Sequence, residues 1–140
     1  MATKKSLGVT GPVAVLGALF ATLSVRWLGL ALVDVPPEFP PLDGPGPTVF
    51  FTVVSGLVAV GVFAAIRRFS RDPVRLFRRI AIGVLVLSFL PDLGLLGAGA
   101  AATFPGATPA GVGLLMLMHV AAAVVIVWAL TAWNGAGKEG

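Results

Sequence analysis

The sequence predicts an all-α integral membrane protein, an antiparallel four-helix transmembrane bundle with both termini in the cytoplasm. Its 140 residues contain four long apolar runs, and a helix needs about 20 apolar residues to cross a hydrocarbon core about 30 Å thick. Only 11% of the residues are charged, whereas soluble domains carry about 25%. We therefore expect a single transmembrane domain with no room for a second. The expected spans are about 11–33, 48–66, 80–99 and 111–133.

The positions of the basic residues predict the orientation. Outside the runs, basic residues occur before the first run, between the second and third, and after the fourth, whereas gaps 34–47 and 100–110 contain none. Because Lys- and Arg-rich loops stay in the cytoplasm, we expect loop 67–79 inside and the other two loops outside. The bias toward Ala, Gly and Arg is typical of a GC-rich bacterial genome, so we expect a multi-pass protein of the bacterial cell (inner) membrane. The basic residues outside the runs are Lys4, Lys5, Arg67, Arg68, Arg71, Arg75, Arg78, Arg79 and Lys138.

Composition also excludes several classes of function. The net charge of +4 does not indicate nucleic-acid binding, because nine of the ten basic residues lie at predicted cytoplasmic edges, where anionic lipid headgroups attract them. No basic, aromatic-interleaved face exists on a soluble element. The sequence contains no cysteine, which excludes disulfides, thiolate chemistry, Cys-ligated zinc and iron–sulfur clusters.

The first span is expected over residues 11–33. Pro12 fits the first turn of a helix, where its missing N–H is not needed. A cleaved signal peptide is the main alternative, with the two preceding lysines as its charged region and residues 13–23 as its apolar region. The apolar run continues to Leu32 without a clear small-x-small cleavage site, which favours a membrane span.

Loop 34–47 holds six prolines among its fourteen residues and three acidic residues. This proline content excludes a helix interior and predicts a stiff, extended connector on the outer face. A proline-rich recognition ligand is the alternative interpretation.

In the span that follows, Ser55 and Ala59 are four residues apart, as are Gly17 and Ala21 in the first span. Small residues at this spacing favour close approach of helix backbones in lipid.

The cytoplasmic loop 67–79 carries six arginines. Pro73 suits the first turn of a short helix, with Asp72 near its cap. Phe77 falls on an apolar edge among the arginines, so we expect an interfacial amphipathic turn that leads into the third span. Lipid-headgroup binding is the expected role of the arginines, and docking of an acidic partner is the alternative. They are Arg67, Arg68, Arg71, Arg75, Arg78 and Arg79.

The third span contains Pro91, which should kink the helix because it cannot donate a backbone hydrogen bond to Leu87. The loop 100–110 that follows is short and uncharged. The fourth span ends at Trp133, which suits the belt of aromatic residues at the inner headgroups.

One polar side chain in each span is expected at a similar depth. With a rise of about 1.5 Å per residue, Asp92 lies about 18 Å, His119 about 20 Å and Arg26 about 22 Å above the inner boundary. Ser55 lies about 16–18 Å above it. These four side chains predict a polar layer in the outer half of the bilayer.

Buried charges in this layer should be paired, because Arg or Asp at a helix centre costs about 2.5–3.5 kcal/mol. We predict an ion pair between Arg26 and Asp92 that faces the bundle interior, with His119 within hydrogen-bonding reach. Ser88 is four residues before Asp92 and shares its face. Its hydroxyl could donate to the carboxylate or to a carbonyl freed by Pro91.

Two interpretations of the layer remain open. The polar groups could be structural, locking the register of the helices. Alternatively, Arg26, Asp92 and His119 could line an outer-half cavity that binds or transports a small lipophilic or protonatable molecule. No catalytic residue is predicted, because paired-carboxylate, Ser-His-Asp and HExxH patterns are all missing from the sequence. No metal or cofactor is predicted either, since His119 has no second axial ligand for a haem.

Four short segments resemble a known family. They are Phe39-Pro40-Pro41-Leu42, Arg67-Arg68-Phe69-Ser70-Arg71, Leu85-Val86-Leu87-Ser88-Phe89-Leu90-Pro91 and Met118-His119-Val120. Through them the chain resembles a family of small bacterial four-span membrane proteins of unknown function, of the actinomycete type. The resemblance implies a membrane bundle and no activity, cofactor or site residue. We therefore expect a non-enzymatic membrane protein, an accessory subunit of a larger membrane complex or a homo-oligomer, with the lipid bilayer as its main partner.

Overall fold

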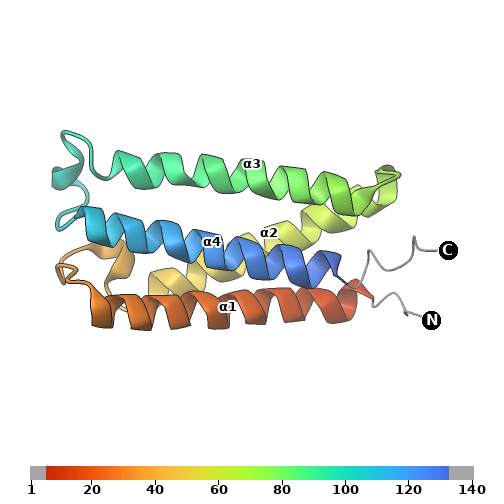
Figure 1. The fold of residues 1–140 in the computed structure, drawn as a ribbon, viewed down its shortest axis with the longest axis horizontal. Helices are drawn as coiled ribbons and strands as arrows, with labels where there is room; N and C mark the ends of the chain where they lie inside the picture. The colour runs from red at the N-terminus through yellow and green to blue at the C-terminus, as the bar shows by residue number, and fades with distance from the viewer. Residues whose placement is uncertain (1–5, 133–140) are drawn as a thin grey trace.

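The structure, a computed structural model, describes residues 6–132. It confirms the all-α fold class: within the described residues there are four α-helices, two short 3₁₀ turns and no strand (Figure 1). The order is α1 (Leu7–Leu32), η1 (Pro40–Leu42), α2 (Gly46–Phe69), α3 (Pro73–Gly94), η2 (Ala100–Ala102) and α4 (Pro109–Thr131).

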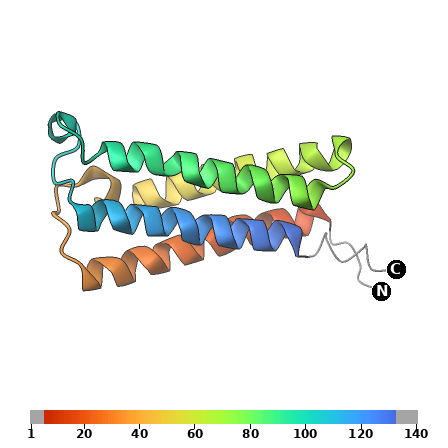
Figure 2. The same cartoon turned by 45° about the horizontal axis from the view of Figure 1, so that its top comes forward.

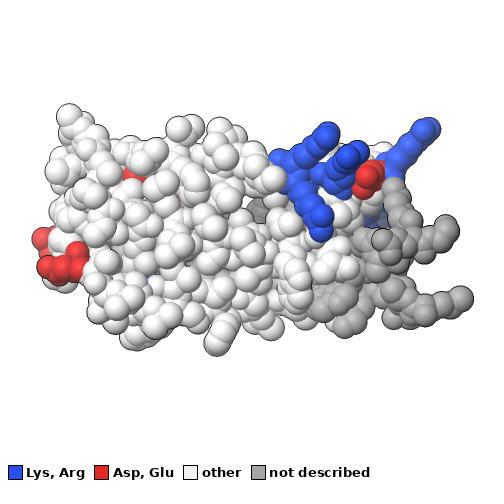
Figure 3. Space-filling view, in the orientation of Figure 1, with Lys and Arg blue, Asp and Glu red and all other residues white. Residues whose placement is uncertain are grey.

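The helices alternate in direction, so connections gather at two opposite ends. The α1–α2 and α3–α4 connections lie at one end, and the short α2–α3 turn lies at the other (Figures 1 and 2). The exposed arginines gather at the α2–α3 end, where Asp72 caps α3, and a cluster of acidic side chains marks the opposite end (Figure 3). The seventh described arginine, Arg26, is buried and contacts the α1–α2 connection at that opposite end. This arrangement fits the predicted separation of basic and acidic loops. Lys4, Lys5, Trp133 and Lys138 lie outside the described residues.

Three helices, α1, α2 and α4, are long and apolar enough to cross a membrane, which indicates a membrane protein. The helix α3 also has 22 residues, but Arg75, Arg78 and Arg79 begin it and Asp92 lies two residues from its end. Any stretch of 18 residues in α3 therefore contains at least three charged side chains. Charge at both ends, rather than a polar middle, distinguishes α3 from the other three helices.

The third helix begins at Pro73, seven residues before the apolar run from which its span was predicted. Pro73 occupies the first turn, and the Asp72 carboxylate accepts a hydrogen bond from the Arg75 N–H at 3.2 Å, as predicted for a cap. The predicted amphipathic turn is thus the start of α3 and not a separate helix. Pro12 was expected in the first turn of its helix, but α1 begins at Leu7 and Pro12 lies in its second turn.

Close helix packing depends on glycines that face a neighbouring helix. A Cβ atom at Gly17 of α1 would lie 3.0 Å from Val125 of α4, and one at Gly56 of α2 would lie 3.0 Å from Val15 of α1. Gly17 belongs to a predicted small-residue pair. In α2, however, Ser55 is exposed and the adjacent Gly56 faces α1.

The proline-rich connection is not extended, contrary to the prediction. Its η1 turn folds back over the end of the bundle, and Phe39 and Leu42 pack against Val112 and Leu115 of α4. Phe39 is fully buried. Two apolar side chains among the prolines explain the difference, because their burial favours folding back and the fixed φ of proline suits a 3₁₀ turn.

Candidate functional site

Of the five predicted polar residues, the structure brings only Asp92 and His119 together. Asp92 and His119 meet where α3 packs on α4, with 3.0 Å between His119 Nδ1 and Asp92 Oδ2. The proximity expected for these two residues is therefore present. The aspartate side chain is 10% exposed and the histidine side chain 42% exposed, so the pair has a buried acid and an accessible imidazole.

The hydrogen bonding of the pair is divided. His119 Nδ1 also lies 2.9 Å from the carbonyl oxygen of Leu115, one turn earlier in α4. The buried Asp92 Oδ2 has no well-aligned hydrogen-bond donor in the part of the chain described. Because Nδ1 carries at most one proton, a charged Asp92 must share that proton with the Leu115 carbonyl. The pair can therefore tie α3 to α4 through a polar contact.

Arg26 does not pair with Asp92, so this prediction is wrong. Its guanidinium is buried and donates a hydrogen bond from Nη2 to the carbonyl oxygen of Leu42 at 3.0 Å. The guanidinium carbon lies 5.6 Å from the centre of the Trp27 ring, a cation–π distance. The reason is the arrangement of the helices: α1 packs on α2 and α4, and α3 lies beyond them (Figure 1). Arg26 therefore anchors the folded proline-rich connection to α1.

Neither serine joins the predicted layer. Ser55 Oγ donates to the carbonyl of Thr52 at 3.1 Å, and Ser88 Oγ donates to the carbonyl of Leu85 at 2.6 Å, each within its own helix. Ser88 thus reaches neither the Asp92 carboxylate nor the carbonyl freed by Pro91. A serine in an apolar helix can satisfy its hydroxyl on the preceding turn, so its presence alone does not indicate an interhelical contact.

Sequence reasoning missed a buried threonine pair that joins α1 and α2. The hydroxyls of Thr22 and Thr52 lie 3.2 Å apart, and both side chains are buried. Thr48, one turn before Thr52, is also buried, and its hydroxyl has no partner among the described residues. The available signal was the four-residue spacing of Thr48 and Thr52, which places both on one helix face.

All six arginines of the predicted headgroup cluster are exposed at the end that carries the α2–α3 turn. One of them also ties two helices, because Arg78 Nη2 donates to Thr131 Oγ1 of α4 at 3.2 Å. Exposure at one end of the bundle suits contact with anionic headgroups.

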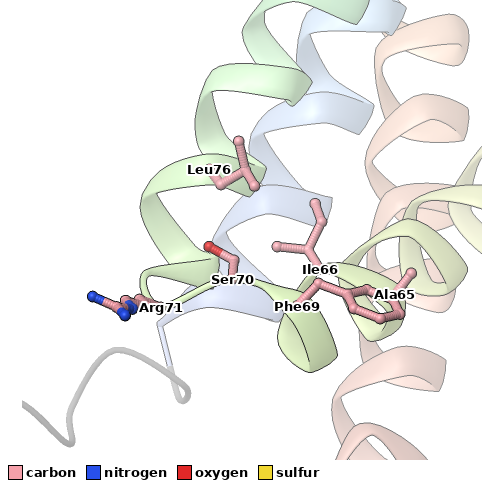
Figure 4. Close-up of a pocket in the computed structure, with 6 residues that line it drawn as sticks. All are labelled: Ala65, Ile66, Phe69, Ser70, Arg71 and Leu76. Atoms are coloured by element: carbon pink, nitrogen blue, oxygen red, sulfur yellow. The ribbon is translucent and has the colours of Figure 1, made fainter.

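Two open hollows lie toward this same end. One has a volume of about 460 Å³ and is formed at the α2–α3 turn (Figure 4). The other, about 380 Å³, is a groove between α3 and α4. No three His, Asp or Glu side chains of residues 6–132 gather where they could hold a metal ion. The first hollow is lined by Ala65, Ile66, Phe69, Ser70, Arg71 and Leu76.

Comparison with known proteins gives one match. A family model described as a family of unknown function, DUF6069, matches residues 2–135. No curated protein and no solved structure matches the chain.

Proposed function

Because the chain belongs to DUF6069, a family of unknown function, we propose a role from the geometry: a non-enzymatic integral membrane protein whose polar side chains tie its helices together. The observation that carries this proposal is where the polar contacts fall. Thr22–Thr52 joins α1 to α2, and Asp92–His119 joins α3 to α4 at one end. Arg78–Thr131 joins the same two helices at the other end. In lipid there is no hydrophobic driving force between helices, so such contacts add to van der Waals packing in holding them together.

The proposal includes four membrane crossings. α3 lies beside α4 along its length (Figures 1 and 2), and its 22 residues correspond to about 33 Å at about 1.5 Å per residue. A bilayer crossed by α4 is therefore crossed by α3 as well. The arginines at the start of α3 can extend to the headgroups, and Asp92 at the other end is paired. The arginine-rich end is cytoplasmic under the positive-inside rule, which gives a multi-pass protein of the bacterial inner membrane.

Replacement of Asp92 separates this proposal from transport. In detergent micelles, Asp92→Asn should lower the midpoint of thermal unfolding, because it weakens the tie between α3 and α4. In liposomes, wild type and Asp92→Asn should show the same proton flux, measured with an enclosed pH-sensitive dye. Ser88→Ala is the matched control, since the Ser88 hydroxyl serves only its own helix, and it should leave both readouts unchanged.

The opposite result would support the alternative function, transport of a small protonatable molecule. That result is a pH-dependent flux in wild-type liposomes that Asp92→Asn abolishes while the unfolding midpoint stays the same. Tags fused at Met1 and Gly140 test the topology independently. Both should be accessible only from the cytoplasmic side, and accessibility of one tag from each side would contradict four crossings.

A further inference from the structure

A groove lies between α3 and α4, two helices that contact each other through polar side chains near both ends. At one end, Arg78 contacts Thr131, and at the other, Asp92 contacts His119. The groove lies next to the Arg78 end, and small residues stand on both of its sides, Ala81 from α3 and Ala123 from α4. Small side chains at this level leave the space between the helices open.

The walls of the groove are apolar and its mouth is basic. Ile82 and Leu85 of α3 face Val124 and Val127 of α4 across it, and Arg78 and Thr131 close the end nearest the α2–α3 turn. From Arg78 to Leu85 the helix rises about 10 Å. The groove therefore has the shape of an apolar slot with a cation at one end.

Arg78 retains donors for a ligand at this mouth. The guanidinium group has five N–H donors, and Thr131 accepts from Nη2. Arg75 lies one turn earlier, on the same side of α3 as Arg78, and both are exposed. A guanidinium can bind two phosphate oxygens at once. The mouth is thus suited to a phosphate group.

We infer that this groove binds one acyl chain of an anionic phospholipid of the cytoplasmic leaflet, with the lipid phosphate on Arg78. The inference rests on the membrane placement proposed above and adds a lipid-specific site to it. Charge complementarity selects the headgroup, and the apolar walls select the chain. An acyl chain is much narrower than a helix, whose diameter with side chains is about 10–12 Å, so a single chain can lie within the open groove of about 380 Å³.

Native mass spectrometry of the full-length protein tests the site. Delipidated protein in detergent is titrated with phosphatidylglycerol or with phosphatidylcholine. We expect wild type to retain one phosphatidylglycerol at concentrations at least tenfold lower than phosphatidylcholine. Arg78→Gln should lose this preference. Arg68→Gln, which removes an exposed arginine outside both hollows, should keep it.

A second variant tests the acyl-chain half of the site without changing charge. Ala123→Leu fills the groove and should reduce retention of phosphatidylglycerol at least tenfold, with an unchanged unfolding midpoint. A phosphatidylglycerol with brominated chains gives a further readout, because Trp128 lines the groove. Quenching of wild-type fluorescence should fall in Trp128→Phe and persist in Trp27→Phe.

Three results would overturn the inference. They are equal retention of the two lipids by wild type, equal loss of preference in Arg78→Gln and Arg68→Gln, and a dimer that Ala123→Leu dissociates while lipid retention is unchanged. Any of these, with both tags still on the cytoplasmic side, removes the lipid site and leaves the proposed function standing. Release of wild type from membranes by alkaline carbonate would instead remove the proposed function.

Discussion

The helices α3 and α4 are nearly equal in length, 22 and 23 residues, but they are held in different ways. α4 contributes nine buried residues, whereas α3 contributes only Phe77 and Asp92. α4 packs on α1 at close range along glycine-containing faces, and α3 packs mainly on α4. α4 is thus held by close packing along its length, whereas α3 is held by polar side-chain contacts near its two ends. Two helices of similar length can therefore differ widely in how many of their side chains are buried, because burial depends on how many neighbouring helices each one contacts.

The largest expected effect comes from one substitution made in each helix. Leu130 of α4 is fully buried, whereas Leu87 of α3 is 62% exposed. Leu130→Ala should destabilise the protein by about 3 kcal/mol, because it leaves a cavity. Leu87→Ala should change stability by less than about 0.5 kcal/mol. Unfolding in mixed micelles, followed by tryptophan fluorescence, measures both, and equal losses would contradict the comparison.

Overpacking should give the next largest effect. A Cβ atom at Gly29 of α1 would overlap the side chain of Leu114 in α4, whereas a Cβ at Gly83 of α3 would meet open space. Gly29→Leu should destabilise by about 1–3 kcal/mol. Gly83→Leu should be neutral or slightly stabilising, since leucine favours helix more than glycine does. The same unfolding assay applies. A larger loss for Gly83→Leu would mean that α3 has a close neighbour on that face.

The Asp92–His119 contact should couple α3 to α4 measurably. A double-mutant cycle with Asp92→Asn and His119→Gln should give a coupling energy of about 1–2 kcal/mol, the range of model interhelical hydrogen bonds in lipid. The measurement is again the free energy of unfolding in micelles. Strictly additive effects would show that the two side chains are adjacent without stabilising each other.

The smallest effect is expected from the hydroxyl pair of α1 and α2. A cycle with Thr22→Val and Thr52→Val should give a coupling of about 0.6 kcal/mol, because close packing at Gly56 already holds these two helices. A coupling energy greater than that of the Asp92–His119 pair would contradict the comparison. It would mean that the packing of α1 on α2 depends more on polar contacts than the packing of α3 on α4 does.

The sequence was informative about the start of α3, the meeting of Asp92 with His119 and the separation of charged loops. Asp72 and Pro73 have the chemistry of a helix start, and they start α3. Depth counting brought Asp92 and His119 to one level, and they meet there. Charge placement separated the loops that lie at opposite ends of the described chain (Figure 3).

The remaining features depend on which helices are neighbours, and depth does not specify this. Arg26 was predicted to pair with Asp92 because the two lie at similar depth. However, α1 packs mainly against α4 and α2 rather than against α3, and Arg26 bonds to the connection after α1 instead. The rotation of a helix about its axis also cannot be predicted from a uniformly apolar run. In α2 this rotation exposes Ser55 and places Gly56 and Thr52 inward. A periodic apolar face would have indicated the rotation, but this run has none.

The burial of Phe39 has a consequence for biogenesis. Phe39 lies in the connection after α1, the first helix to be synthesised. Its ring packs against the start of α4, the last helix, near Gly111. The α1 helix likewise has its most extensive contacts with α4. During insertion, Phe39 and the α4-facing side of α1 therefore remain without their native neighbours until the fourth helix has been synthesised. Truncation before residue 109 should yield a species that quality-control proteases recognise, even though most of its helices have already been made.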